Sequence, residues 1–261
     1  MRILSVCNWA VRVTVGLLIC LGLPPITASA QTSETAEEII DRVDRLLRGD
    51  SSHGVARMEV VTENWERQLT MEMWSLGVDY SLIRVQAPAR EAGTATLKAT
   101  EDIWNYLPKV DRAIKIPASM MAGAWMGSHF TNDDLVKESQ LIKDYFIELT
   151  YDGDRDGVTV WEFRLTPKPE APVVWGHVDY QVRQADYMPL WTRFYAEDGE
   201  LARTMRYSEF TNLGGRIVPA VMEMVPADKP GETTKVIYEQ LLFDVDIDQS
   251  FFSLRNLQRG Q

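Results

Sequence analysis

The chain has 261 residues, of which 45% are hydrophobic and 25% are charged, a balance typical of globular proteins and not of disordered or disulfide-rich ones. Its formal net charge is −11. Nucleic-acid binding and electrostatic docking on anionic lipid both need clustered Lys and Arg, so this composition argues against both, and we expect no nucleic-acid partner.

The first 30 residues have the pattern of a secretory signal peptide. Arg2 and Arg12 are followed by an apolar run over 13–23, and Ala28-Ser29-Ala30 matches a signal peptidase site. The run has about 11 residues, whereas a membrane-spanning helix needs about 20. We expect cleavage after Ala30 and a periplasmic location, with a retained membrane anchor as the alternative.

Both cysteines, Cys7 and Cys20, lie inside this predicted signal peptide. The mature chain, which we expect to begin at Gln31, would then contain no disulfide, no thiolate nucleophile and no cysteine metal site. Lipidation at Cys20 is an alternative, but Leu18-Ile19 stands where a lipobox requires a small residue. An exported chain without disulfides fits the bacterial periplasm.

An amphipathic helix is predicted over 35–48. Thr35 and Glu38 have the spacing of a capping box, and Gly49 suits the position that follows a helix. The apolar residues of this segment recur at the spacing of one helical face: Ile39, Ile40, Val43, Leu46 and Leu47.

Beyond this helix the hydrophobic period changes to two, which is typical of strands. Leu69, Met71 and Met73 alternate with neighbours on the opposite face, as do Ile83, Val85 and Ala87. Most connections are too short for helices, so we expect one antiparallel, meandering sheet. Further strand-like runs are 94–100, 102–107, 112–116, 140–151, 158–166, 173–183, 188–196, 201–210, 216–225 and 234–245.

The segment 117–137 interrupts the strand pattern. Its first part, 117–130, is rich in Met, Ala and Gly, and its second part reads as a short helix capped by Thr131, with Asp133 and Asp134 in the first turn. No internal repeat or low-complexity linker is present, so we predict a single domain over 31–261 after the signal peptide.

The segment from Asp152 to Gly157 matches the start of an EF-hand calcium loop. The bidentate Glu that closes such a loop is missing, because Phe163 stands at that position. We therefore expect a polar hairpin turn without a calcium site, and weak calcium binding is the alternative.

The histidines do not have the spacing of a metal site or a catalytic pair. His53, His129 and His177 are far apart in the sequence. Ser128 precedes His129, but adjacent side chains on an extended chain point apart, and there is no nucleophile-elbow motif. We therefore expect no metal, no cofactor and no enzymatic activity.

Several longer motifs resemble the LolA-like outer-membrane lipoprotein-sorting protein family, in its poorly characterised branch. The resemblance implies an α+β fold: a strongly curved antiparallel sheet, or incomplete β-barrel, covered by lid helices that enclose an apolar cavity for lipid chains. The matching motifs include Asp102-Ile-Trp-Asn-Tyr-Leu-Pro-Lys-Val-Asp-Arg112, Gly127-Ser-His-Phe-Thr-Asn-Asp-Asp-Leu135 and Phe251-Phe-Ser-Leu-Arg-Asn-Leu257, together with 73–77, 79–85, 88–94, 116–121, 167–169 and 174–176.

Large, flexible side chains are the candidates for lining such a cavity. Methionine thioethers adapt to variable apolar ligands, although they also fill ordinary cores. The helix 35–48 and the segment 117–137 are the covers that the sequence offers for the open sheet. The predicted ligand-binding residues are Met71, Met73, Ile83, Val85, Trp104, Met120, Met121, Trp125 and Met126.

The predicted function is that of a periplasmic, non-enzymatic carrier that binds the acyl chains of lipoproteins or lipids and moves them towards the outer membrane. The expected partners are these acyl chains, an inner-membrane transporter and an outer-membrane acceptor, and we expect a monomer. The alternatives are an accessory lipid-binding subunit of an inner-membrane lipid or hydrophobe transporter, and an envelope lipid sensor.

Overall fold

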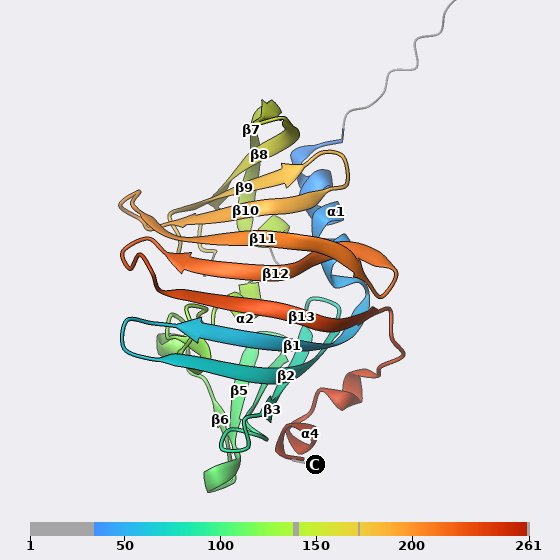
Figure 1. Cartoon of the computed structure of the whole chain (residues 1–261), viewed down its shortest axis with the longest axis vertical. Helices are drawn as coiled ribbons and strands as arrows, with labels where there is room; N and C mark the ends of the chain where they lie inside the picture. The colour runs from blue at the N-terminus through green and yellow to red at the C-terminus, as the bar shows by residue number, and fades with distance from the viewer. Residues whose placement is uncertain (1–33, 138–140, 172, 260–261) are drawn as a thin grey trace, which may run out of the picture. The chain divides into compact units, whose positions relative to one another are not determined.

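The computed structural model describes residues 34–137, 141–171 and 173–259 (Figure 1). The predicted signal peptide and the expected mature N-terminus, Gln31, lie outside the described residues. Residues Glu34–Gln261 form one compact unit by their contacts.

The N-terminal helix α1, Ala36–Arg48, forms as the sequence predicts. The Thr35 backbone N–H donates to the Glu38 carboxylate at 2.7 Å, and the Glu38 N–H donates to the Thr35 hydroxyl at 3.2 Å. Gly49 follows the helix with φ of 69°, a conformation that glycine adopts without strain. The capping box and the apolar face of this helix are therefore both confirmed.

Thirteen strands of the described chain form a single antiparallel sheet in the order β6-β5-β4-β3-β2-β1-β13-β12-β11-β10-β9-β8-β7. The edge strands of the described sheet, β6 and β7, do not pair with each other, so the sheet is an incomplete barrel, as the family resemblance implies. The strands are β1 (Ser51–Val61), β2 (Glu66–Leu76), β3 (Tyr80–Ala87), β4 (Ala95–Ala99), β5 (Asp102–Leu107), β6 (Arg112–Lys115), β7 (Tyr145–Arg155), β8 (Val158–Pro167), β9 (His177–Arg183), β10 (Met188–Tyr195), β11 (Leu201–Leu213), β12 (Arg216–Pro226) and β13 (Thr233–Phe243).

The sequence prediction missed one strand and began others too early, such as 173–183, of which only His177–Arg183 form a strand. Residues 51–61 form β1 at the centre of the sheet, although no strand was expected there. This strand places Ser52, Gly54 and Ala56 on one face, and these small side chains hide the hydrophobic alternation. The predicted strand 140–151 is also too early, because Leu141–Asp144 form the short helix α3 and β7 begins at Tyr145.

The sheet buries side chains on both faces. We call the face that carries Met71 and Met73 the inner face. One core cluster on this face joins Met71 to Met205 and Met224, and a second packs α1 against Phe163 and neighbouring residues. Figure 1 shows α1 running across strands of the C-terminal half of the sheet.

The outer face of β3–β5 is covered by the C-terminal segment, which was not predicted as a cover. Phe252 and Leu257, of the helix α4 (Leu254–Gln258) and the residues before it, pack against Leu82 and Leu97. The Arg84 guanidinium, also on this face, donates to the Asn256 carbonyl at 2.7 Å. The chain end is therefore an integral part of the core.

The segment 117–137, which we call the lid segment, lies against the inner face. It contains two single 3₁₀ turns, Ala118–Met120 and Trp125–Gly127, and the short helix α2, Asp134–Lys137. Thr131 accepts the Asp134 N–H at 3.2 Å, so the predicted cap on this helix is confirmed. The remaining 3₁₀ turns are Pro108–Val110 and Gln249–Phe251.

Candidate functional site

A cavity of about 310 Å³ lies between α1, the lid segment and the inner face of the sheet. Its walls include Ile40 and Leu47 from α1, Phe130 and Leu135 from the lid segment, and Leu141 from α3. Because α3 contributes to the wall, the cover consists of three segments and not only the two predicted ones. The volume is near the lower limit of small-molecule sites.

Met73 and Ile83 are the predicted site residues that line this cavity. They lie directly opposite each other on β2 and β3, and Met71 lies opposite Val85 in the same pair of strands. The alternation in the sequence therefore places all four side chains on one face, as predicted. Their role in ligand binding stays a prediction.

Four other predicted residues belong to the packed core beside the cavity. Met71, Val85 and Trp125 are almost completely buried, and Met126 packs against the same cluster. The indole N–H of Trp125 donates to the Thr96 hydroxyl at 3.0 Å, which fixes the ring over the sheet.

The last three predicted residues lie elsewhere. Met120 is 54% exposed, and Met121 is half-buried beside it. Trp104 lies opposite Leu97, and both side chains belong to the cluster under the C-terminal segment, so Trp104 faces away from the cavity. A strand that is buried on both faces gives no sequence signal for which alternate set faces a ligand.

The opposite wall of the cavity comes from strands whose contribution the sequence analysis did not assign. Met205 and Met224 face each other across β11 and β12, and Tyr207 faces Met222 in the same way. Alternation within the predicted run 216–225 puts Met222 and Met224 on one face and could have identified them. The lining residues of this wall are Trp175, Val178, Tyr180, Thr192, Phe194, Met205, Tyr207, Val218, Pro219, Met222, Met224, Tyr238 and Leu241.

A buried arginine fastens the lid segment to β11. The Arg203 guanidinium donates to the Asp134 carboxylate through two nitrogens, one of them at 2.9 Å, and to the His129 carbonyl at 3.1 Å. It also lies 4.5 Å from the ring centre of Trp175 and 4.6 Å from that of Phe194. Charge, hydrogen bonds and ring contacts therefore act together on one side chain.

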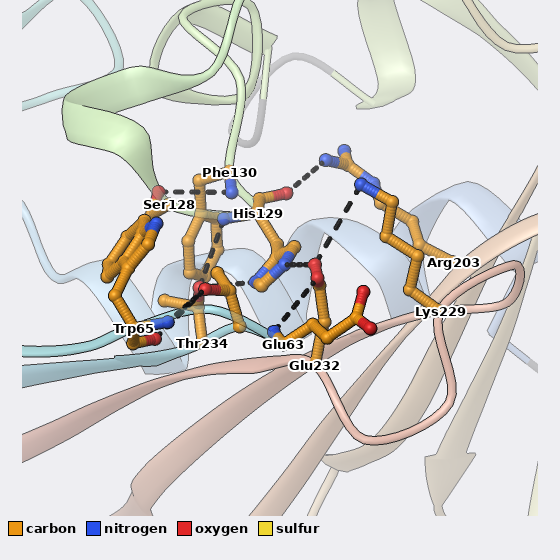
Figure 2. Close-up of polar contacts among 10 residues, drawn as sticks. Glu63, Trp65, Ser128, His129, Phe130, Arg203, Lys229, Glu232 and Thr234 are labelled. Carbon is orange, nitrogen blue, oxygen red and sulfur yellow. Dashed lines mark hydrogen bonds and ion pairs between the residues drawn. The ribbon is translucent and has the colours of Figure 1, made fainter.

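A second polar contact joins the lid segment to β13, as Figure 2 shows. The His129 ring bonds to the Thr234 hydroxyl at 2.8 Å and to the Glu232 carboxylate at 3.0 Å. The Glu63 backbone N–H also donates to Glu232. The bond from His129, followed by the one from Glu63, lowers the pKa of the Glu232 carboxyl.

A third polar contact fastens the lid segment to β2, and we call these three contacts the polar fastenings. The Arg67 guanidinium donates to the Met126 carbonyl at 2.7 Å and is paired with Glu91. Met126 and Gly127 have φ values of 49° and 69°, so the backbone turns sharply where Arg67 holds it. The lid segment is thus held on β2, β11 and β13 at the same time.

The hydrolase and calcium interpretations gain no support from the local geometry. The Ser128 hydroxyl donates to the Trp125 carbonyl at 2.8 Å and is turned towards the Phe130 N–H, away from the neighbouring imidazole. The Asp152–Gly157 segment forms the predicted hairpin between β7 and β8, in which Arg155 pairs with Val158. Among the described residues, no group of three or more His, Cys, Asp or Glu side chains could hold a metal ion.

No helix in the described parts of the chain is long and apolar enough to cross a membrane.

Comparisons with known proteins agree with this architecture. An outer membrane lipoprotein-sorting protein domain, so described, from Vibrio parahaemolyticus is 22% identical, with a TM-score of 0.76 over 86% of this chain and 98% of that one. A LolA superfamily protein from Nitrosomonas europaea is 23% identical, with a TM-score of 0.73 over 86% of this chain and all of the other (100%).

A DUF1329 family protein from Desulfovibrio piger is 21% identical, with a TM-score of 0.77 over 85% of this chain and 97% of that one. None of the curated proteins matches the chain. The model of a family described as "Uncharacterized protein" matches residues 77–259, which is more than half of the chain. The chain therefore belongs to this family of uncharacterised proteins, and its fold is that of the LolA superfamily.

Proposed function

We propose that the protein is a periplasmic carrier that binds acyl chains of lipoproteins or lipids in the cavity beneath the lid segment and moves them towards the outer membrane. The observation that carries this proposal is the cavity itself, which is walled mainly by apolar side chains and covered by α1, α3 and the lid segment. The LolA-like fold supports it, since one structure of this fold is described as lipoprotein-sorting.

The energetics of an acyl chain explain why a carrier needs such a cavity. Each buried methylene contributes about 0.8 kcal/mol, so a chain of about 14 methylenes costs roughly 11 kcal/mol to expose to water. A carrier has to offset most of this cost and still release the chain. Flexible methionines in the wall, such as Met73, Met205 and Met222, can repack around chains of different shape.

This function requires no bond to be made or broken. Release instead requires the cavity to open, and the polar fastenings of the lid segment are the contacts that must break or rearrange. Because these fastenings and the bond from Trp125 to Thr96 lie on four different strands, we expect opening to be cooperative.

The direct test is mass spectrometry of organic extracts from protein purified out of the native periplasm. The expected result is a stoichiometric amount of an acylated molecule, reduced in a variant with Met73→Lys. Recovery of protein without any acylated molecule, combined with failure to bind added fatty acid, would contradict the proposal.

A transfer assay separates a carrier from a sensor or an accessory subunit. Purified protein is mixed with donor vesicles that contain a fluorescent acyl lipid and with unlabelled acceptor vesicles. A carrier accelerates transfer in proportion to its concentration, whereas a protein that only detects or presents lipid leaves the rate unchanged.

A further inference from the structure

Every charged side chain that the structure describes on the cavity wall has a partner within the chain. The Arg48 guanidinium donates to the Asp44 carboxylate, one turn earlier in α1, at 2.6 Å. The Asp134 carboxylate is paired with Arg203 of β11. Both acids are therefore neutralised by guanidinium groups of the protein itself.

Lys98 and Asp133 complete this balance. Lys98 is 3% exposed, and its ammonium donates to the Val78 carbonyl and takes part in a further interaction. Asp133 is 5% exposed and likewise has a partner. The described wall thus offers no unpartnered charge to a ligand. A charged headgroup would have to compete with contacts that already exist, and an unpaired charge in a poorly solvated site is costly.

A headgroup of either sign would also meet repulsion. An anionic headgroup would face Asp44, Asp133 and Asp134, whereas a cationic one would face Arg48 and Lys98. Such unfavourable contacts are a common source of selectivity against the wrong ligand. The wall therefore favours a ligand without net charge.

A row of serine hydroxyls gives the same wall uncharged hydrogen-bonding groups. Ser52, Ser75 and Ser81 are successive register partners on β1, β2 and β3, and all three line the cavity. Directly opposite residues of antiparallel strands share a face, so the row lies on the inner face. Two residues further along β2 and β3, Met73 and Ile83 begin the apolar part of the wall.

This serine row has hydrogen-bonding capacity to spare. The Ser52 and Ser75 hydroxyls bond to each other at 2.6 Å, a bond that uses only one of their two O–H groups. The Ser81 hydroxyl makes no hydrogen bond to another residue in the described parts of the chain. Because a hydroxyl both donates and accepts, the row is suited to the hydroxyl and ester oxygens of a glyceryl group.

We propose that the serine row binds the uncharged glyceryl ester group of an acyl lipid, while the acyl chain lies over Met73 and Ile83. A monoacylglycerol and the glyceryl anchor of a lipidated protein share this chemistry. The position of the chain rests on the proposed carrier function, whereas the preference for an uncharged headgroup rests on the partnered charges and the serine row.

Competition among amphiphiles that share one 12-carbon chain tests this proposal. The reporter is the methyl ester of dansyl-undecanoic acid, which carries no charge. At pH 8, 1-monolauroylglycerol should displace it at a concentration about ten-fold lower than anionic laurate or cationic lauroylcholine does. Laurate should still bind, through its chain alone. Methyl laurate is more apolar than 1-monolauroylglycerol but lacks hydroxyls, so it should bind about five-fold more weakly.

A serine variant assigns this preference to the row. Ser81→Ala should lower the affinity for 1-monolauroylglycerol about five-fold and leave the affinity for methyl laurate unchanged. Ser208→Ala is the matched control, because Ser208 is exposed on β11 and does not line the cavity. Both affinities should be unchanged in the control.

A diacylglyceryl lipopeptide with an uncharged peptide separates the two sources of the glyceryl group. Stronger displacement by the lipopeptide indicates a lipidated protein, and stronger displacement by 1-monolauroylglycerol indicates a free lipid. Either result supports the headgroup site.

The remaining outcomes distinguish this inference from the carrier function. The headgroup site is overturned if laurate, lauroylcholine or methyl laurate binds as tightly as 1-monolauroylglycerol, or if Ser81→Ala binds 1-monolauroylglycerol like the wild type. The carrier proposal survives both results. Failure of the reporter and of every 12-carbon amphiphile to bind in a calorimetric titration overturns the carrier proposal itself.

Discussion

The Arg203 guanidinium on β11 is paired with the Asp134 carboxylate of the lid segment, and both side chains are largely withdrawn from solvent, with 6% and 15% exposure. Removing one partner of a buried pair leaves the other charge uncompensated. The same arginine holds the His129 carbonyl, so this pair ties the turn before α2 to the sheet.

We expect Asp134→Ala to lower the free energy of unfolding by about 3–5 kcal/mol. Urea denaturation followed by fluorescence measures this loss. The matched control is Asp179→Ala, because Asp179 forms a comparable two-bond pair with Arg164, whose side chain is 47% exposed. That change should cost less than about 1 kcal/mol, and equal losses in the two variants would contradict a fastening role for Arg203.

Met71 and Met73 provide a matched test of core against cavity. Both lie on the inner face of β2, but Met71 is 1% exposed within the core cluster, whereas Met73 lines the cavity. We expect Met71→Lys to unfold the protein, because a charge would be buried without a partner. Met73→Lys should keep the fold and abolish binding of a fluorescent fatty acid.

Circular dichroism measures whether each variant folds, and a titration with the fluorescent fatty acid measures whether it still binds. If Met73→Lys also unfolds, this part of the wall is ordinary core and the cavity does not accept a ligand there. Met73→Ala then distinguishes packing from charge, because it removes apolar contacts without adding a polar group.

The Glu232 contact predicts a dependence of stability on acid pH. The hydrogen bond from His129 lowers the pKa of this carboxyl in the folded state, so the carboxylate stabilises the fold at pH values above its unfolded pKa of about 4.5. This stabilisation should disappear as the pH falls through the lower, folded pKa. Wild type should therefore melt at a higher temperature than Glu232→Gln at pH 7, and the difference should shrink as the pH falls below about 4.5.

Differential scanning calorimetry between pH 3 and pH 7 measures this effect. Glu148→Gln on the edge strand β7 is the control, because Glu148 is exposed and its change should not alter the melting temperature at any pH in this range. A constant difference between wild type and Glu232→Gln at all pH values would contradict the prediction.

The C-terminal helix is expected to stabilise the outer face of the sheet. Leu257 is fully buried against the cluster that contains Leu82 and Leu97, so Leu257→Ala should cost about 2–5 kcal/mol. Leu254 in the same helix is 40% exposed, and Leu254→Ala should cost far less. Chemical denaturation of both variants is the measurement, and similar losses would show that α4 is not docked as described.

The sequence predicted best those features that depend on local chemistry. The Thr35–Glu38 capping box and the hairpin at Asp156 follow from residues close together in the chain, and both form as expected. Alternation also placed Met71, Met73, Ile83 and Val85 on a common face. These signals require no knowledge of distant partners.

The features that were missed depend on which elements meet in space. Trp104 was assigned to the site, but β3–β5 are covered on both faces, and only the docking of Phe252 and Leu257 decides which face Trp104 joins. Ser81 and Lys98 both line the cavity, and they are neighbours only through the register of β3 and β4. A lysine in a strand is normally exposed, so its residue type gives no signal that Lys98 is buried.

The pairing of the first strand, β1, with the last strand, β13, affects how fast the chain can fold. Val55 pairs with Gln240, and the β1–β13 ladder is the hydrogen-bonded link between strands β1–β6 and β7–β13 of the described sheet (Figure 1). Pairings between residues so far apart in sequence form slowly, because a long loop must close first. The sheet cannot be completed until nearly the whole chain has been synthesised, so we expect slow folding, and the proposed periplasmic location would then require export of a chain that has not yet folded.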